Sequence, residues 1–435
     1  MSGAEVDGQR DAGLLRAVGP TALAASIVCQ TVGATIFVVP ATLAAALGVY
    51  APLALLGCGV AIGAIAICFA EGGSRIPTSG GPYGYIEAAF GPAVGYVVGT
   101  LLWVGNVLAC GGVAAALGDV GASLSSPSLD GPVRAMTIIG AVGSIAAVNI
   151  AGVTRGAGLV KLATALKLLP LAVFVLAGVP AMHAANFSHA ALPAEGGLGR
   201  AVILALFAYT GLEVALSASG EVAQPNRTIP RALAIAMPSI MALYIAIQIV
   251  AQGILGDAHA HSSAPLADAM APAGLRTLMV AGAAFSMFGM LSSDLMGSPR
   301  QLFAFGREGL LPAVLGRVHV RSRAPYVAIA TYAALAAGLA LTGSFARLAV
   351  LATLAVIPVY AAGCASAWLL ARRQIALAGA PLGFRFLGTA ASAGIVSMLL
   401  LASLAERADI LGVGALMAAS ALVYLIQRRA VLARE

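Results

Sequence analysis

Residues 18–47 read VGPTALAASIVCQTVGATIFVVPATLAAAL, an apolar stretch that contains no charged side chain. A helix needs about 20 mostly apolar residues to cross the hydrocarbon core of a bilayer, so this stretch is long enough to span it. Gly33 weakens a helix, and Pro40 removes a backbone hydrogen-bond donor. The sequence therefore predicts a transmembrane helix that opens near its middle.

The composition of the whole chain agrees with a membrane protein. Of the 435 residues, 60% are hydrophobic and 9% are charged, whereas soluble domains have about 45–50% apolar and about 25% charged residues. The 52 glycines and 21 prolines fit as well, because both are commoner in transmembrane helices than in soluble ones. These numbers exclude a soluble enzyme, a disordered chain and a fibrous repeat.

Apolar stretches of sufficient length occur twelve times in the chain. We predict transmembrane helices over 18–47, 51–70, 93–122, 133–152, 158–180, 199–220, 231–255, 274–298, 325–342, 345–370, 386–405 and 409–427. The mixed-charge segment 1–17 lacks a cleavage-site pattern, so we do not expect a removable signal peptide.

The basic residues predict the orientation of these spans. With the N-terminus placed in the cytoplasm, eighteen of the 24 Lys and Arg residues fall in cytoplasmic segments. Five fall outside: Arg134, Arg200, Arg276, Arg347 and Arg407. Because Lys and Arg accumulate in cytoplasmic loops, we predict an even number of spans with both termini in the cytoplasm. The net charge of +7 arises between the spans and does not indicate nucleic-acid binding.

The predicted sixth span contains a second interruption. Residues 207–213 read FAYTGLE and lead into a Ser- and Gly-rich segment that ends at Glu221. Opened half-helices offer N–H groups to an anion and carbonyls to a cation, so a zwitterion satisfies both. Matching interruptions in two halves of a chain are typical of the central site of a secondary transporter. Alternatively, the glycines only let neighbouring helices pack closely.

Lys167 is the one basic residue in the middle of a predicted span. A charge at that depth is expensive and indicates a functional role with a specific partner. Two interpretations stay open. The lysine either gains and loses a proton during a transport cycle, or it is a fixed internal cation that backbone carbonyls neutralise.

Acidic residues occur at two other mid-span positions. Glu213 follows the predicted break in the sixth span, where bracing of the opened segment is favoured over gating or proton transfer. Asp294 follows two serines, whose hydroxyls either help to bind sodium or bond across helices. Glu71 and Asp119 lie near span ends, where we expect them to be solvated or paired.

The sequence offers no pattern for catalysis or metal binding. Five cysteines lie inside apolar runs without the paired spacing of a metal site or disulfide framework, and we interpret them as core residues: Cys29, Cys58, Cys68, Cys110 and Cys364. The histidines lie in predicted loops, and no nucleophile–base motif or phosphate-binding loop occurs. We therefore predict no enzymatic activity, no cofactor, no metal site and no ATP-driven transport by this chain alone.

Four ordered blocks resemble the amino acid-polyamine-organocation superfamily of secondary transporters. Residues 33–40 (GATIFVVP) are similar to its Gly-Ser-Gly-Ile-Phe-x-x-Pro signature, and residues 77–83 (PTSGGPY) to its Pro-x-x-Gly-Gly-x-Tyr loop. Residues 207–231 resemble its sixth span and the loop that follows, and residues 298–312 its eighth-to-ninth connection. The resemblance covers most of the chain, from Gly33 to about Pro325.

The resemblance implies an all-α membrane fold with a five-plus-five inverted repeat and two additional C-terminal helices. On this chain the first repeat covers 18–180 and the second covers 199–370. The additional helices fall within 386–427, and the cytoplasmic tails are 1–17 and 428–435.

The resemblance also implies a midplane site for a substrate with an α-amino and an α-carboxyl group. The carboxylate would meet backbone N–H groups, and the ammonium would meet carbonyls, while Phe207 would close over the substrate and Asn106 would line the pocket. The implied substrate-binding residues are Thr31, Gly33, Ala34, Thr35, Asn106, Phe207, Ala208, Tyr209, Thr210 and Gly211. Asn106 alternatively links two helices.

Two positions refine this expectation. Lys167 matches the lysine that replaces a sodium site in some family members, which favours proton coupling or coupling-free exchange over sodium symport. Thr35 stands where the signature has its second glycine, and a β-branched residue narrows backbone freedom. Its hydroxyl is a candidate to line the pocket.

We predict a secondary active transporter of amino acids in a bacterial inner membrane, with proton-coupled uptake through Lys167. An exchanger of an amino acid against a metabolite or polyamine is the alternative. Neutral substrates are favoured, because a basic substrate would need acidic residues in the pocket and Glu213 is the only candidate there. From other classes, an intramembrane enzyme lacks a catalytic pair, a channel lacks charged rings, and a non-transporting sensor would need more than these short tails. The partners of the predicted transporter would be the bilayer, the substrate and protons.

Overall fold

The computed structural model describes most of the chain. The described residues are 18–76, 81–187, 198–216, 222–262, 264–307, 309, 311–322, 324–377 and 381–432. Within them every regular element is a helix, and the one β-type pairing is an isolated parallel bridge between Val18 and Val222. The predicted all-α class is therefore confirmed for the described part of the chain.

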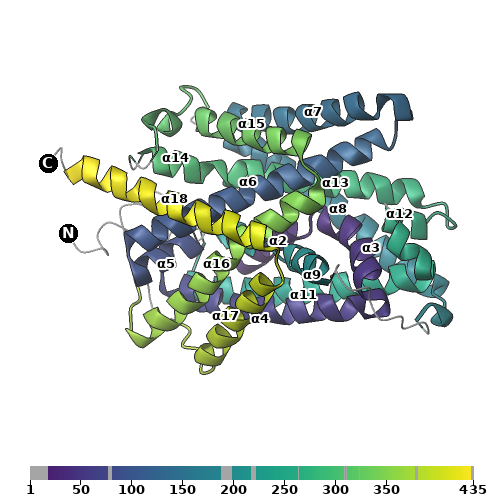
Figure 1. Cartoon of the computed structure of the whole chain (residues 1–435), viewed down its shortest axis with the longest axis horizontal. Coiled ribbons are helices and arrows are strands. Elements are labelled where there is room, and N and C mark those ends of the chain that lie inside the picture. The colour runs from purple at the N-terminus through teal and green to yellow at the C-terminus, as the bar shows by residue number, and fades with distance from the viewer. Residues whose placement is uncertain are drawn as a thin grey trace.

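The helices form one bundle, in which many of the long helices run along the horizontal axis of the view (Figure 1). The first half contains α2 (Pro20–Thr31), α3 (Thr35–Leu47), α4 (Ala51–Arg75), α5 (Pro82–Phe90), α6 (Pro92–Ala122), α7 (Asp130–Ala151) and α8 (Val153–Gly178). The second half contains α9 (Leu198–Phe207), α10 (Leu212–Leu216), α11 (Pro225–Leu255), α12 (Pro265–Ala269), α13 (Arg276–Gly297), α14 (Pro299–Arg307), α15 (Tyr326–Thr342) and α16 (Phe345–Arg372). The last two helices are α17 (Leu387–Ser403) and α18 (Arg407–Leu432).

Eight helical segments of the described chain are long and apolar enough to cross a membrane. They are Thr35–Arg75, Pro92–Ala122, Pro127–Ala151, Leu198–Leu216, Pro225–Leu255, Arg276–Arg307, Phe345–Arg372 and Arg407–Gln427. Three shorter apolar helices are Leu166–Ala181, Tyr326–Thr342 and Leu387–Ser403. These segments confirm a multi-pass membrane fold, while the count of twelve spans and the inverted repeat stay predictions.

The centre of the bundle depends on close approach between α6 and α16, which pack extensively against each other. A Cβ atom at Gly105 would lie 3.1 Å from Val356 Cγ2, and one at Gly112 would lie 3.3 Å from Leu348 Cβ. Small residues let helix backbones approach each other in a membrane, so these glycines fix the distance between the two helices. The five cysteines are buried among the helices, as predicted.

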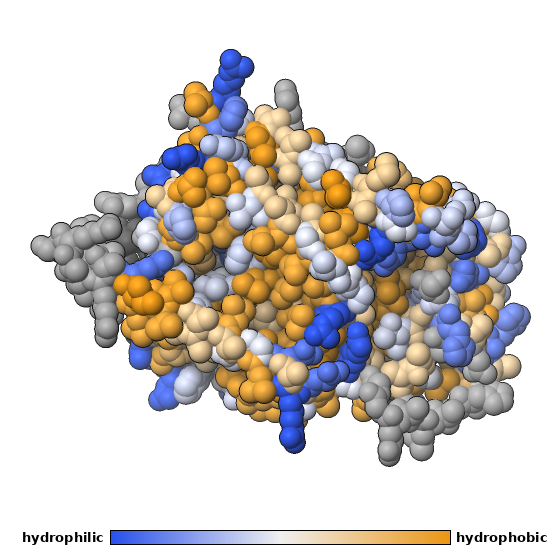
Figure 2. All heavy atoms as spheres, turned by 45° about the horizontal axis from the view of Figure 1, so that its top comes forward, coloured by the Kyte–Doolittle hydropathy of each residue, from blue (hydrophilic) through white to orange (hydrophobic). Residues whose placement is uncertain are grey.

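The face of the bundle shown in Figure 2 is largely apolar. Large hydrophobic side chains are exposed on several outer helices, including Met136 on α7, Leu399 on α17 and Leu411 on α18. A soluble protein rarely exposes extended apolar areas, whereas a lipid environment favours them. The outer helices therefore present their apolar side chains to the bilayer.

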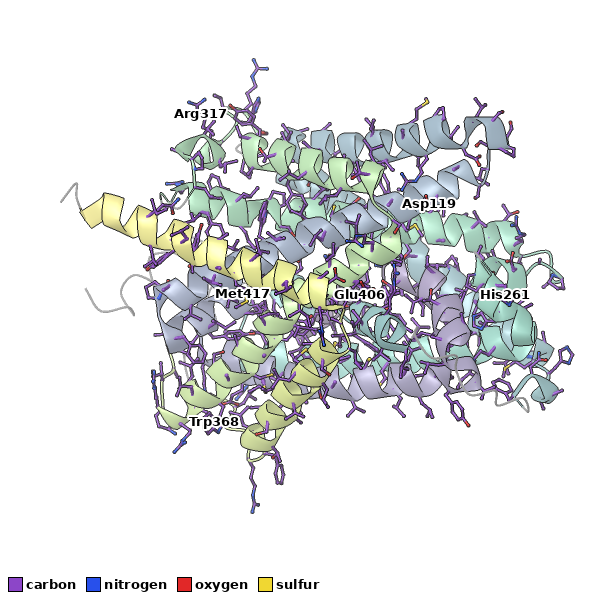
Figure 3. The ribbon with its side chains drawn as sticks, in the orientation of Figure 1. Asp119, His261, Arg317, Trp368, Glu406 and Met417 are labelled. Atoms are coloured by element: carbon purple, nitrogen blue, oxygen red, sulfur yellow. The ribbon has the colours of Figure 1, made fainter. Side chains whose placement is uncertain are left out.

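Polar and aromatic side chains mark the two ends of the bundle. Arg317 and Trp368 lie at one end, and Asp119 and His261 lie toward the other (Figure 3). Asp119 accepts from Arg134 at 2.6 Å, which is the pairing predicted as one of its two alternatives. Arg317, predicted to be cytoplasmic, is thus distant from Asp119 and His261 along the bundle, whereas Glu406 is nearer its middle (Figure 3). The orientation in the membrane stays a prediction.

Glu71 forms a buried ion pair at the end of α4. Arg75 Nε donates to Glu71 Oε1 at 2.8 Å, and both side chains are almost completely buried. Glu71 also accepts from the backbone N–H groups of Gly383 and Phe384, each at 3.3 Å, and Arg75 donates to the Ile375 carbonyl at 3.2 Å. The pair therefore holds the connection between α16 and α17 against α4.

Candidate functional site

The first predicted interruption is present in the structure. Helix α2 ends at Thr31 and α3 begins at Thr35, so residues 32–34 separate two half-helices. A Cβ atom at Gly33 would lie 3.3 Å from Cγ of Met290 on α13. The small residue thus allows α13 to approach the break, and the predicted opening of the first span is confirmed.

The second interruption follows the same plan. Helix α9 ends at Phe207, residues 208–211 form a turn, and α10 begins at Leu212. Gly211 has φ +117°, a backbone conformation that residues with a Cβ rarely adopt. A Cβ atom there would lie 3.1 Å from the carbonyl carbon and oxygen of Gln30. The prediction of a break is confirmed here too, and the second break packs against the last turn of α2, beside the first break.

Lys167 on α8 contacts the backbone at the first break. Its ammonium group donates to the carbonyls of Cys29 and Val32, the latter at 2.7 Å, and its side chain is fully buried. The C-terminal end of a helix carries unpaired carbonyls and a partial negative charge. The lysine therefore neutralises the open end of α2 and ties α8 to it, which supports the interpretation as an internal cation held by carbonyls.

Two further side chains cover the carbonyls of the first break. Tyr244 on α11 donates its hydroxyl to the Thr31 carbonyl at 3.0 Å, and Ser286 on α13 donates to the Gly33 carbonyl at 3.1 Å. A carbonyl oxygen has two lone pairs, so Thr31 retains capacity for a second donor. Three helices, α8, α11 and α13, thus converge on one exposed stretch of backbone.

Glu213 stabilises the second break from within the same span. Both of its carboxylate oxygens accept from the N–H of Gly211 at 3.1 Å, and Oε2 also accepts from the Tyr360 hydroxyl at 2.5 Å. The side chain is buried. A carboxylate at the start of a helix complements its partial positive charge, and the contacts support the bracing role over a gate.

The aromatic residues of the second break have defined partners. Phe207 packs edge-to-face against Phe345 at the start of α16, with ring centroids 6.0 Å apart. The Tyr209 hydroxyl donates to the Leu55 carbonyl at 2.9 Å, and its ring lies 5.3 Å from that of Tyr244. Thr210 turns its hydroxyl back to the Phe207 carbonyl at 2.8 Å. Tyr209 and Thr210 are thereby held in place by protein groups.

Gln30 is a site residue that sequence reasoning did not identify. Its Oε1 and the Oγ1 of Thr31 are buried and have no hydrogen-bond partner among the described residues. Buried polar atoms normally have a partner, so these two acceptors beside the breaks are candidate contacts for a polar ligand or a water molecule. A glutamine inside an apolar span was the available signal.

Of the remaining predicted residues, Ala34 and Thr35 belong to the first break or border it, whereas Asn106 and Asp294 lie on other helices. Ala34 and Thr35 are buried at the start of α3, and Asn106 is 7% exposed on α6. Asp294 on α13 accepts from Ser298 at 2.7 Å and from Tyr332 on α15 at 2.5 Å. The Tyr332 contact links α13 to α15. Ser292, one of the two serines before Asp294, donates its hydroxyl to the Phe288 carbonyl of its own helix at 2.7 Å, so the predicted bonding of this serine across helices is not seen. None of these contacts involves the breaks.

Comparison with known proteins gives a consistent family. A family model described as amino acid permease matches residues 18–426. An uncharacterized transporter of Mycobacterium tuberculosis is 32% identical over 316 residues, which cover 66% of this chain and 66% of that protein. The chain thus spans about two thirds of the length of that relative.

Two similar proteins come from Bacillus subtilis. The serine/threonine exchanger SteT is 27% identical over 333 residues, which cover 74% of this chain and 75% of the exchanger. A methylthioribose transporter is 26% identical over 318 residues, with 68% of each chain covered. All of these relatives carry the name of a transporter or exchanger.

Proposed function

Because the chain belongs to the amino acid permease family, we propose that it is a secondary transporter and not an enzyme. Its substrate would be a small neutral amino acid, carried across the cytoplasmic membrane by alternating access between the two sides. The observation that carries this proposal is the contact between the two interrupted spans, where Gly211 packs against the backbone of Gln30.

The two breaks supply complementary groups for a zwitterion. The N-terminal end of α3 offers backbone N–H groups at Gly33, Ala34 and Thr35 for a carboxylate, as helix N-termini do. The C-terminal end of α9 offers carbonyls in the segment 207–210 for an ammonium group. The unpartnered Gln30 and Thr31 oxygens support a ligand with further hydrogen-bond donors.

The hydrogen bonds of Glu213 support a neutral substrate. This carboxylate already accepts from Gly211 and Tyr360, and it would have to give up these bonds to pair with a basic side chain. The second helix half would lose its brace in the process. A cationic substrate is therefore disfavoured on energetic grounds.

Coupling to protons is proposed to involve Lys167. While protonated, the lysine holds the open end of α2 through two carbonyls. A neutral amine has fewer N–H donors and no charge, so deprotonation would weaken this tie and free α2 to move. The competing proposal is amino-acid exchange without proton coupling, which is favoured by the relative named as a serine/threonine exchanger.

Uptake into proteoliposomes tests the function directly. A panel of labelled amino acids is presented with and without an inward proton gradient, to the wild type, to Lys167→Met and to Arg276→Ala. Arg276 is the charge-removing control, because its side chain is 61% exposed. We expect a neutral amino acid to accumulate with the gradient in the wild type and in Arg276→Ala, and Lys167→Met to lose that dependence.

Two results would contradict parts of the proposal. Uptake that requires an internal amino acid and ignores the gradient would identify an exchanger, with a structural role for Lys167. Ligand binding without accumulation or counterflow of any amino acid would reject transport in favour of a sensor.

A further inference from the structure

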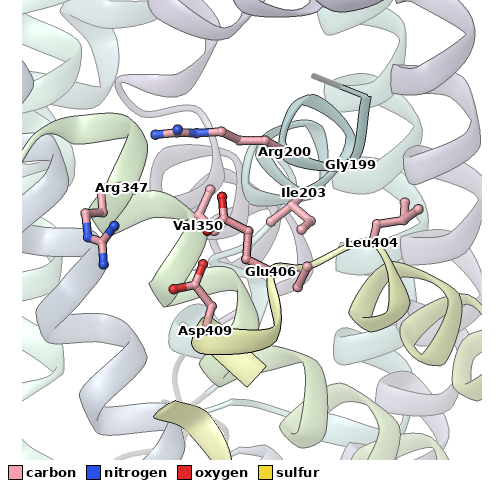
Figure 4. Close-up of a pocket in the computed structure, with 9 residues that line it drawn as sticks. Gly199, Arg200, Ile203, Arg347, Val350, Leu404, Glu406 and Asp409 are labelled. Atoms are coloured by element: carbon pink, nitrogen blue, oxygen red, sulfur yellow. The ribbon is translucent and has the colours of Figure 1, made fainter. Parts of the chain in front are cut away.

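A pocket lies away from the two breaks, where the turn between α17 and α18 meets α9 and the start of α16 (Figure 4). Its volume is about 120 Å³, which exceeds the roughly 10–15 Å³ of probe volume that one water molecule needs. The backbone of Leu404 packs directly on Gly199, leaving no space for a Cβ atom there. The turn and α9 are thus in firm contact.

Four charged side chains surround this pocket. Arg200 comes from α9, Arg347 from α16, and Glu406 and Asp409 from the turn and the first residues of α18. Figure 4 shows the two guanidinium groups and the two carboxylates directed toward a common space. In the described part of the chain, none of the four forms an ion pair with another. Two positive and two negative groups therefore share one cavity without neutralising each other by direct contact.

The remaining wall of the pocket is apolar. Ile203 and Val350, both buried, line it together with Leu404. A ligand with charges of both signs and a short, uncharged side chain matches this combination. An anion would meet two carboxylates, and a cation would meet two guanidinium groups, so each is disfavoured by like-charge repulsion.

The position of the pocket connects it to the second break. Arg200 and Phe207 lie seven residues apart on α9, a distance of about 10 Å along the helix axis. Arg347 follows two residues after Phe345, the ring that packs on Phe207. The pocket therefore lies at the far end of the half-helix that leads to the central breaks.

We propose that this pocket is a second, outer binding site for a free amino acid zwitterion, in which Arg200 and Arg347 hold the carboxylate and Glu406 and Asp409 hold the ammonium group. The inference rests on the proposed function, since it assigns the same substrate class to a different site. Arg200 and Arg347 are among the basic residues predicted to lie outside, and Glu406 lies in the short segment between the spans predicted over 386–405 and 409–427. The site would collect substrate there before the amino acid reaches the breaks.

Transport kinetics of neutralised variants test this site. The variants are Arg200→Gln, Glu406→Gln and Asp409→Asn, and the matched control is Arg407→Gln, which removes a charge from the same turn without lining the pocket. We expect each pocket variant to raise the external KM about three- to tenfold, because each variant loses one charge-assisted hydrogen bond to the substrate. The maximal rate, the internal KM and the thermal stability should remain unchanged, and Arg407→Gln should match the wild type.

The possible outcomes separate this proposal from others. A wild type that transports an amino acid, with an unchanged external KM in all pocket variants, would overturn the outer site and leave the proposed function intact. Equal changes in external and internal KM, or a fall in the maximal rate, would assign the charges a structural or gating role. A KM effect confined to membranes that contain phosphatidylethanolamine would make a lipid headgroup the occupant. A wild type that transports no amino acid would reject the proposed function itself.

Discussion

The two interrupted spans are stabilised by charges of opposite sign, and the difference follows from the helix end that each break exposes. The first break leaves carbonyls at the end of α2, and the cation Lys167 binds them. The second break leaves N–H groups at the start of α10, and the carboxylate of Glu213 accepts from Gly211. Each ion thus complements the partial charge of the helix end beside it.

The two ions also differ in their distance along the sequence. Glu213 is two residues from Gly211 and braces its own span. Lys167 is 138 residues from Cys29 and joins two helices. The first break therefore depends on a long-range contact between α8 and α2, whereas the second is largely self-supporting, with Tyr360 on α16 as its additional partner. This asymmetry can be tested by mutation.

The largest effect is expected at Lys167. Lys167→Met removes a buried charged donor and leaves two carbonyls without it, which should lower the free energy of unfolding by about 3 kcal/mol. Leu169→Ala is the control on the same helix, because Leu169 is 61% exposed and should change stability little. Thermal unfolding in detergent, followed by reaction of the buried cysteines with a thiol dye, measures the difference. Equal stability of the two variants would contradict the role of Lys167 at the first break.

A smaller effect should separate the two break glycines. Gly211→Ala forces a side chain into a positive-φ conformation against the Gln30 backbone, which should cost about 2 kcal/mol. Gly33→Ala meets only the flexible Met290 side chain, so its cost should stay below about 1 kcal/mol. The same unfolding assay compares the two variants. A larger loss of stability in Gly33→Ala than in Gly211→Ala would contradict this order.

The sequence was informative wherever the cause of a structural feature is local. Gly33 and Gly211 interrupt their helices because glycine lacks a Cβ atom and weakens a helix. This property is visible in the sequence, so both breaks were predictable. The partners of Lys167 were not, because carbonyls 135 and 138 residues away leave no trace in local spacing. Glu71 was correctly predicted as either paired or solvated, yet its contacts with a connection more than 300 residues away required the fold.

The same limit applies to the candidate sites. Gln30 was overlooked because one amide in an apolar span resembles a link between helices, and its unpartnered oxygen is visible only in three dimensions. The outer pocket combines α9, α16 and the turn before α18. Arg200, Arg347 and Arg407 all count equally toward orientation in the sequence, and only the fold separates the two that line the pocket from the one that does not.

A still smaller effect is expected at the brace of the second break. Glu213→Gln keeps one acceptor oxygen but loses the charge, which should lower the free energy of unfolding by about 1 kcal/mol. Tyr360→Phe removes one of the same hydrogen bonds, so the double variant should lose less than the sum of the two single losses. Unfolding measurements on the four proteins form the cycle. Strict additivity would show that the two groups do not act together.

The last prediction extends the comparison to the half-helices that lead away from the breaks, α3 and α9. Whereas α9 borders the charged outer pocket, α3 packs against the 3-10 helix η6 (Gly256–His261), which contains a fully buried histidine, His259. Both ring nitrogens of His259 have no hydrogen-bond partner among the described residues. Burial lowers the pKa of His259 from its ordinary value of 6.5 to about 4, because the charged imidazolium is poorly solvated there.

The sign of the pH effect follows from that shift. Between pH 6.5 and 4 the unfolded chain binds a proton at His259 that the folded chain does not, so this contribution to stability is present above pH 6.5 and is lost as the pH falls. Between pH 7 and 5 the free energy of unfolding should fall by about 0.5–1 kcal/mol more in the wild type than in His259→Leu. This is less than the full pKa shift implies, because local opening lets the imidazole take up a proton without complete unfolding. His261→Leu, at an exposed neighbouring position, is the control and should keep the wild-type pH dependence. If His259→Leu shows the same pH dependence as the wild type, the imidazole does not sense pH, and the packing of η6 on α3 is insensitive to acid.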